Sequence, residues 1–123
     1  MQQDYQEQDL GFGNLAQQYT KPTFMLIDER AISQSEHTGL VFEAIANTTF
    51  IGSPTAGANG NITRAVLPGS IYLTFTGMDV RHIDGRQLQR VGLVPHVPVP
   101  RTIEALAAGR DEVLEKALEL ARE

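Results

Sequence analysis

A serine stands where an apolar segment of this chain meets the start of an amphipathic one. Residues 24–27 are apolar, Ser33 follows a corner of charged and small residues, and Glu36 lies three positions further on. A hydroxyl at a strand-to-helix corner projects clear of the sheet, and the free N–H groups of the first helical turn can stabilise an oxyanion beside it. This arrangement predicts nucleophilic attack by Ser33 on a carbonyl carbon.

The same spacing has a structural interpretation that involves no chemistry. Ser33 and Glu36 fit the S-x-x-E pattern of a capping box, in which the two side chains satisfy backbone N–H groups at a helix start. Every helix needs its first N–H groups satisfied, whereas few proteins need a nucleophile. From spacing alone, the cap is therefore the favoured interpretation.

Two glycines invite a phosphate-binding interpretation, which the neighbouring residues contradict. Gly52 and Gly57 are spaced as in a P-loop, but Ala58 and Asn59 occupy the positions of the required lysine and hydroxyl. The following residues have the pattern of a strand, so the helix N-terminus that would hold a phosphate is missing as well. We expect no nucleotide cofactor.

Metal and cysteine chemistry have little support in the sequence. His82, Asp84 and His96 could be imagined as ligands, but their spacing matches no recognisable metal site. The chain has no cysteine, which excludes disulfides, thiolate metal sites and cysteine catalysis. Fifteen acidic against ten basic residues give a net charge of -5, so we expect no nucleic-acid partner.

The elements around Ser33 indicate an α/β fold with helices covering a layered sheet. Residues 23–27 form a short continuous apolar run, which is typical of a strand buried on both faces. A helix is expected from about Ser35 to Asn47, with an apolar stripe of Leu40, Val41, Ala44 and Ile45. A second strand over residues 48–52 would complete a β–α–β unit.

Further elements are expected after a loop at residues 53–61, which is rich in Gly, Pro and Asn. Three strands broken by turn residues predict a β meander, and prolines suit an extended edge segment after it. Two short helices should close the chain. The expected ranges are 62–67, 71–76 and 78–83 for the meander, 91–100 for the edge segment, 102–108 for the first helix and Asp111 onwards for the second.

The domain organisation expected from these patterns is simple. Residues 1–20 hold six glutamines and two glycines and are expected to form a linker or flexible segment. Residues 21–123 then form one subdomain with a modest core. No apolar run approaches the length of a membrane-spanning helix.

Four motifs, taken together in order, resemble the tail-specific, or C-terminal processing, serine peptidases and their relatives around the tricorn core. They are KPTFMLIDERAISQSE at 21–36, FIGSPTAGANGN at 50–61, LPG at 67–69 and DGRQLQRVGLVPHVPV at 84–99. The resemblance covers residues 21 to the C-terminus and implies an α/β fold of the Clp protease and crotonase type. It also implies peptide-bond hydrolysis through an acyl-enzyme, with a polypeptide as substrate.

The resemblance assigns roles to individual residues. It places the nucleophile at Ser33, and the backbone N–H of Gln34 becomes one oxyanion donor. Gln89 matches a family glutamine close to the active site and is expected to be a supporting residue. The expected substrate-binding loop comprises Gly57, Ala58 and Asn59.

Two departures from the family pattern concern the general base. Lysine-type members carry their base in the loop that here contains Ala58, and other relatives use a histidine from an earlier part of the domain. That earlier half, with its glycine-rich turn, is not present before Lys21. His37, one helical turn after Ser33, is the local alternative, although an i+4 side chain would have to reach beyond the helix start.

Two functions of different classes therefore stay open. One is the C-terminal part of a serine peptidase catalytic domain whose base comes from outside this chain. The other is an inactive peptidase-like domain that binds extended peptides at a sheet edge or mediates assembly. Pairing with the missing N-terminal half, or formation of a homo-oligomer, is expected in either case. The compartment is unknown, and only the resemblance suggests the periplasm or cell envelope.

Overall fold

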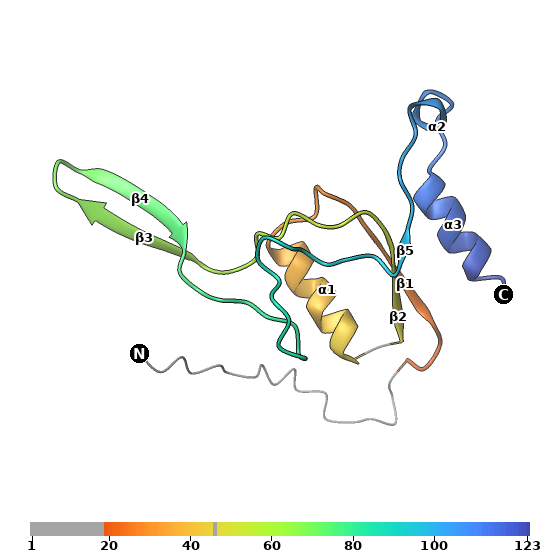
Figure 1. The fold of residues 1–123 in the computed structure, drawn as a ribbon, viewed down its shortest axis with the longest axis horizontal. Helices are drawn as coiled ribbons and strands as arrows, with labels where there is room; N and C mark the ends of the chain where they lie inside the picture. Colours follow the sequence, from red (N-terminus) through yellow and green to blue (C-terminus); the bar gives the residue numbers. More distant parts are fainter. Residues whose placement is uncertain (1–18, 46) are drawn as a thin grey trace.

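The computed structural model describes residues 19–45 and 47–123, and Figure 1 shows their arrangement. A small body holds a three-stranded sheet with one helix on each side, and a long hairpin projects from it (Figure 1). In chain order the elements are β1 (Thr23–Ile27), α1 (Gln34–Ile45), β2 (Thr48–Gly52), β3 (Ile62–Leu67), β4 (Ile71–Thr76), β5 (Val97–Pro98), α2 (Ile103–Ala107) and α3 (Glu112–Leu120).

The central sheet is parallel and has the strand order β1-β2-β5. β1 and β2 are paired along their full length, with Thr23 opposite Thr48, and α1 is the connection between them. β5 pairs with the other side of β2 through Val97 and Pro98. The predicted β–α–β unit and the extended edge segment within residues 91–100 are both confirmed.

Apolar side chains from β2 enter two separate cores, one on each face of the sheet. Phe50 is buried on the side that Leu40 of α1 covers, together with Leu88 and Leu93. Ile51 points to the opposite side, because side chains alternate along a strand, and packs there against Val113 of α3. Burial on both faces explains the continuous apolar run in the sequence, and the predicted α/β fold is confirmed.

Helix α1 differs in detail from the sequence prediction. Its expected stripe is wrong in part, because Leu40 packs in the core but Ala44 is exposed. The face turned inward instead carries Glu36, whose side chain is fully buried, and Gly39. A Cβ on Gly39 would lie 2.2 Å from Leu93 Cδ1, so close packing occupies the place where a side chain was expected.

Strands β3 and β4 form an isolated antiparallel hairpin rather than part of a meander. The third strand expected at residues 78–83 is wrong, since only an isolated bridge joins Arg81 to Gln87. This segment folds back on the residues that follow it. Leu88 N–H donates to Val80 O at 3.3 Å, and His82 N–H donates to the carbonyl oxygen of residue 86 at 3.0 Å.

The C-terminal helices follow the sequence pattern closely. Thr102 caps α2 and Asp111 caps α3, each by accepting a backbone hydrogen bond with its side chain. The linker expected at residues 1–20 lies almost entirely outside the described residues. Within the described part of the chain, no helix combines the length and hydrophobicity needed to cross a bilayer.

Candidate active site

Ser33 occupies a strained corner between β1 and α1. Its φ is 56°, in the left-handed region, and its side chain is exposed. A non-glycine residue in this conformation costs about 1–2 kcal/mol, and such strain is concentrated at functional sites. A helix-capping serine normally has an extended backbone, so the conformation of Ser33 favours the nucleophile interpretation over the cap.

The backbone beside Ser33 offers a free hydrogen-bond donor. Among the described residues, the N–H of Gln34 has no acceptor, whereas the N–H of Ser35 donates to Ile32 O at 3.2 Å. Gln34 is the first residue of α1, where partial positive charge from the aligned peptide groups accumulates. The predicted oxyanion donor thus lies next to the predicted nucleophile and donates to no other group in the described part of the chain.

Glu36 links this corner to the loop that follows β2. Its carboxylate is fully buried and accepts four hydrogen bonds. Oε1 accepts from Thr55 Oγ1 and Gly57 N–H, both at 2.6 Å, and Oε2 accepts from Ala58 N–H at 2.9 Å and Ser33 N–H at 3.2 Å. Of the two hydrogen bonds of a capping box, only the one from Ser33 N–H to the Glu36 carboxylate is therefore present. The other three hydrogen bonds to this carboxylate come from the loop.

The loop itself packs tightly against residues 90–92. Gly57 has a φ of +66°, and its carbonyl oxygen accepts from Arg90 N–H at 2.7 Å. A Cβ on Gly57 would lie 2.9 Å from the backbone nitrogens of Val91 and Gly92. Ala56 N–H donates to Ala31 O at 3.0 Å, which attaches the loop to the serine corner a second time.

The remaining loop residues have different surroundings. Ala58 is exposed, and Asn59 is buried. Asn59 Oδ1 accepts from Gly60 N–H at 2.8 Å, but its Nδ2 has no acceptor among the described residues. The structure thus brings Gly57 and Ala58 to the serine corner through Glu36 and places Asn59 at the base of the hairpin.

Gln89 holds the base of the hairpin and makes no hydrogen bond to Ser33. Its Nε2 donates to Asn59 O at 2.8 Å and to Met78 O at 2.6 Å, and its Oε1 accepts from Val80 N–H at 3.4 Å. Its side chain therefore connects the predicted substrate-binding loop to the segment after β4. This geometry agrees with a supporting rather than a reacting group.

The histidines are held in three different places. His82 is buried, and its Nδ1 lies 2.5 Å from Glu43 Oε2. Glu43 is ten residues after Ser33, which is about 15 Å along α1. His96 Nδ1 accepts from Phe50 N–H at 2.9 Å, and its ring stacks on Phe50. His37 is half-buried one turn into α1. Its imidazole stays a hypothesis as the general base.

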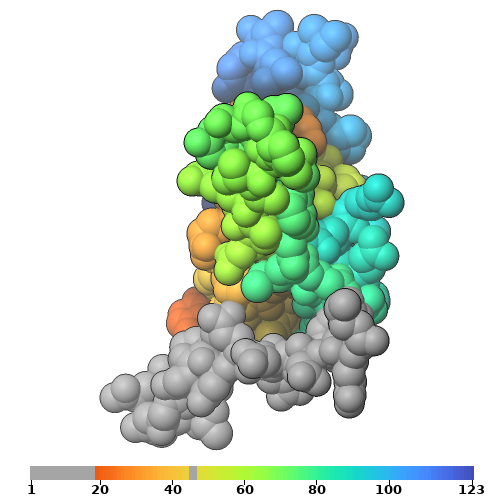
Figure 2. Space-filling model, turned by 90° about the vertical axis from the view of Figure 1, so that its left-hand side faces the viewer, coloured from red at the N-terminus to blue at the C-terminus, as the bar shows by residue number. Residues whose placement is uncertain are grey.

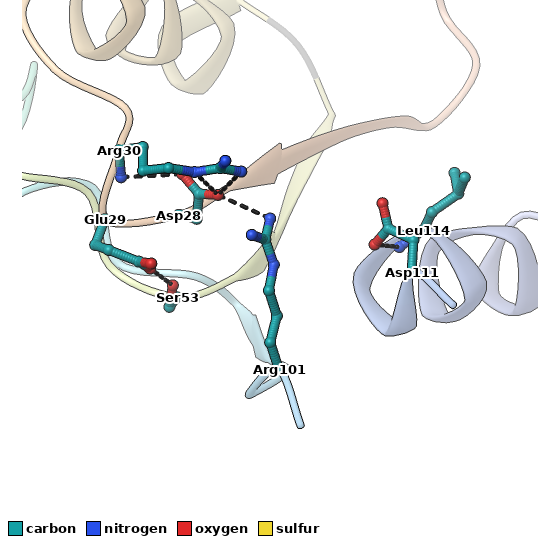
Figure 3. Close-up of polar contacts among 7 residues, drawn as sticks. All are labelled: Asp28, Glu29, Arg30, Ser53, Arg101, Asp111 and Leu114. Carbon is teal, nitrogen blue, oxygen red and sulfur yellow. Dashed lines mark hydrogen bonds and ion pairs between the residues drawn. The ribbon is translucent and has the colours of Figure 1, made fainter. Parts of the chain in front are cut away.

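A turn cross-linked by an aspartate precedes the serine (Figure 3). Asp28 Oδ2 accepts from Arg30 Nη2 at 2.7 Å and from Arg101 Nη2 at 2.8 Å, and Oδ1 accepts from Arg30 N–H at 3.0 Å. These bonds, led by the side-chain hydrogen bond from Arg30, hold the pKa of Asp28 below its usual value. The turn before Ser33 is thereby tied to the chain that follows β5.

The structure adds residues that sequence reasoning did not place in the site. Glu36 appeared only as a capping residue, and Asp28 and Thr55 were not singled out. The S-x-x-E pattern was the available signal for Glu36. The partners of Glu36 in the loop, however, lie 19 to 22 residues away in sequence. Only the folded chain reveals that Glu36 joins the corner and the loop.

The structure is an α/β domain with an exposed serine at the corner between its first strand and first helix. The family model of peptidase family S41 matches residues 1–99. The chain belongs to this family, and the resemblance inferred from the motifs is confirmed at that level.

One relative and two solved structures are similar to this chain over part of their own length. A protein of Chlamydia pneumoniae is 35% identical over 96 residues, which are 76% of this chain and 16% of that protein. Mature CPAF complexed with lactacystin has a TM-score of 0.68 at 24% identity, over 85% of this chain and 20% of that one. The tricorn protease has a TM-score of 0.64 at 21% identity, over 81% of this chain and 10% of that one. The chain therefore spans about a fifth or less of each.

Proposed function

We propose that this chain forms the C-terminal part of the catalytic domain of a tail-specific serine peptidase, with Ser33 as the nucleophile. The observation that carries the proposal is the exposed serine with a φ of 56° beside the N–H of Gln34, which has no acceptor in residues 19–45 and 47–123. A strained nucleophile at a strand-to-helix turn, next to helix N–H groups, is the arrangement that serine hydrolases use.

The proposed reaction follows from these positions. Ser33 Oγ forms a bond to the carbonyl carbon of the substrate, its proton passes to the base, and the carbonyl oxygen becomes an oxyanion. That oxyanion accepts a hydrogen bond from Gln34 N–H. Cleavage of the C–N bond releases the amine with the proton and leaves an acyl group on Ser33. Water then releases the acyl group by the reverse proton transfers.

The proposal places the general base outside this chain. Ala58 stands at the position where lysine-type members carry their base, and His82 and His96 are engaged elsewhere. An unassisted serine hydroxyl is a weak nucleophile near neutral pH. We therefore expect the isolated chain to react slowly and to accelerate when a base is supplied.

Labelling with a fluorophosphonate probe in the presence and absence of imidazole tests the proposal. We expect slow labelling of the wild-type chain and at least about tenfold faster labelling with imidazole, since a general base contributes 10²–10⁴-fold when well placed. Ser33→Ala should abolish labelling, and Ser35→Ala, on the exposed side of the same helix start, should retain it. Labelling that survives in Ser33→Ala, or that never appears with imidazole, would reject Ser33 as the nucleophile.

A second function is favoured by one feature of the sheet. β1 is the edge strand in the order β1-β2-β5, and its outer side has no partner among the described residues. An open strand edge can accept an extended peptide by strand addition. An inactive peptidase-like domain that binds peptides would show such binding and no imidazole-dependent labelling.

A further inference from the structure

We propose that one face of the β3–β4 hairpin binds an extended, uncharged, apolar segment of the peptide substrate. This inference rests on the proposed peptidase function and names the kind of substrate that the site accepts. The hairpin projects from the body close to the N-terminal end of α1 (Figure 1). In the view of Figure 2 its residues, in green, stand in front of the body with no other described segment across them.

The register of the hairpin separates two different faces. Because opposite residues in an antiparallel pair share a face, Thr63, Ala65 and Leu67 lie beside Phe75, Leu73 and Ile71. We call these six residues the apolar hairpin face. Leu73 is 47% exposed and Ile71 is 60% exposed. The opposite face is mixed, since it carries Arg64 and two threonines beside its apolar residues.

The size of this face suits a peptide better than a folded partner. Strands of six residues at about 3.3 Å per residue are about 20 Å long, and two strands are about 10 Å wide. The footprint is then about 200 Å², far below the roughly 800 Å² that each partner buries in a standard protein interface. An extended peptide of about six residues would cover it.

The face is also continuous with the proposed active site. Residues 59–61 lead from the loop held by Glu36 directly into β3, and Gln89 bonds to both Asn59 and Met78 at the hairpin base. A peptide at the serine corner could therefore extend along the hairpin. Arg64 is the only charged residue between positions 61 and 77 and lies on the other face. None of the six residues of the apolar hairpin face carries a charge.

The proposal is tested by measuring peptide binding without turnover. The whole chain carrying Ser33→Ala is titrated into a fluorescein-labelled peptide of valines, leucines and alanines, and anisotropy gives the dissociation constant. Combining Leu73→Thr and Phe75→Thr with Ser33→Ala should weaken peptide binding at least about tenfold, because two large apolar contacts are lost. The matched pair Val66→Thr and Tyr72→Thr, on the opposite face, should change it by less than about twofold. Threonine preserves strand propensity in both pairs.

Other outcomes would overturn the inference. An equal loss of peptide affinity in both pairs of variants would contradict a specific apolar face. No loss of affinity in either pair, or equally tight binding of an acidic peptide, would contradict it as well. If sedimentation shows a wild-type dimer that only Leu73→Thr and Phe75→Thr dissociate, while peptide binding is unchanged, the face serves a second copy instead. Failure of Ser33 labelling with face-dependent peptide binding intact would reject the peptidase function alone.

Discussion

At the scale of single residues, Glu36 holds together the two parts of the candidate site. The buried carboxylate of Glu36 forms no ion pair with the residues that the structure describes, so it requires several hydrogen-bond donors, and four hydrogen bonds satisfy it here. Two of them come from the loop backbone and one from Ser33 N–H. The position of the serine is therefore coupled to the position of the loop through one side chain.

Replacing this carboxylate should affect both stability and reactivity. In Glu36→Gln, the amide NH₂ would face at least one backbone donor, so we expect a loss of about 2–3 kcal/mol in the free energy of unfolding. The rate at which the fluorophosphonate probe labels Ser33 in the presence of imidazole should fall as well. Urea unfolding and labelling rates measure the two effects. Glu29→Gln is the matched control, because Glu29 accepts a hydrogen bond from Ser53 at the exposed surface, and this variant should lose much less stability than Glu36→Gln.

At the scale of elements, the loop after β2 is defined by what it packs against. Gly57 and Gly85 both have positive φ values, +66° and +86°. A Cβ on Gly57 would meet three backbone nitrogens, whereas a Cβ on Gly85 would meet nothing within 4 Å. The two glycines thus separate the cost of conformation from the cost of close packing.

Alanine substitutions at these two positions should differ in size. Gly85→Ala should cost about 1–2 kcal/mol from the left-handed conformation alone. Gly57→Ala carries the same cost and should lose a further 1–3 kcal/mol or so, because the backbone of residues 90–92 must move. It should also slow the labelling of Ser33. Equal unfolding free energies for the two variants would show that the packing of this loop is less tight than its contacts indicate.

At the scale of the whole molecule, Asp28 connects regions that are distant in sequence. Arg101, 73 residues away, bonds to the same carboxylate oxygen as Arg30. The turn before the serine is thereby joined to the segment that leads into α2 and α3 (Figure 3). The serine corner depends in this way on the docking of the C-terminal part.

This connection predicts a specific dependence of stability on pH. The folded-state pKa of Asp28 is lowered, mainly by the side-chain hydrogen bond from Arg30. The stabilisation is therefore present above the unfolded-state value of about 3.9 and is lost as the pH falls through the folded-state pKa. Asp28→Asn should be less stable than wild type near neutral pH, and the difference should shrink below about pH 4. Urea unfolding across this range measures it, and a difference that is independent of pH would contradict the role of the charge.

The sequence alone was sufficient for features that depend on local pattern. Residues 23–27, 48–52, 62–67 and 71–76 are strands with the predicted bounds, because apolar runs and turn residues are local signals. The placement of Ser33 at a strand-to-helix corner is equally local. The family motifs then distinguished the peptidase interpretation from a simple helix cap.

Only the tertiary structure decided which side chains meet. Residues 78–83 do not form the predicted third strand of a meander, because their backbone groups form hydrogen bonds with residues 86–88 instead. Glu36, Gln89 and His82 have partners 9 to 39 residues away, and no periodicity in the sequence encodes such contacts. The identity of the corner serine was thus local information, whereas the support that holds it beside the loop arises from long-range packing.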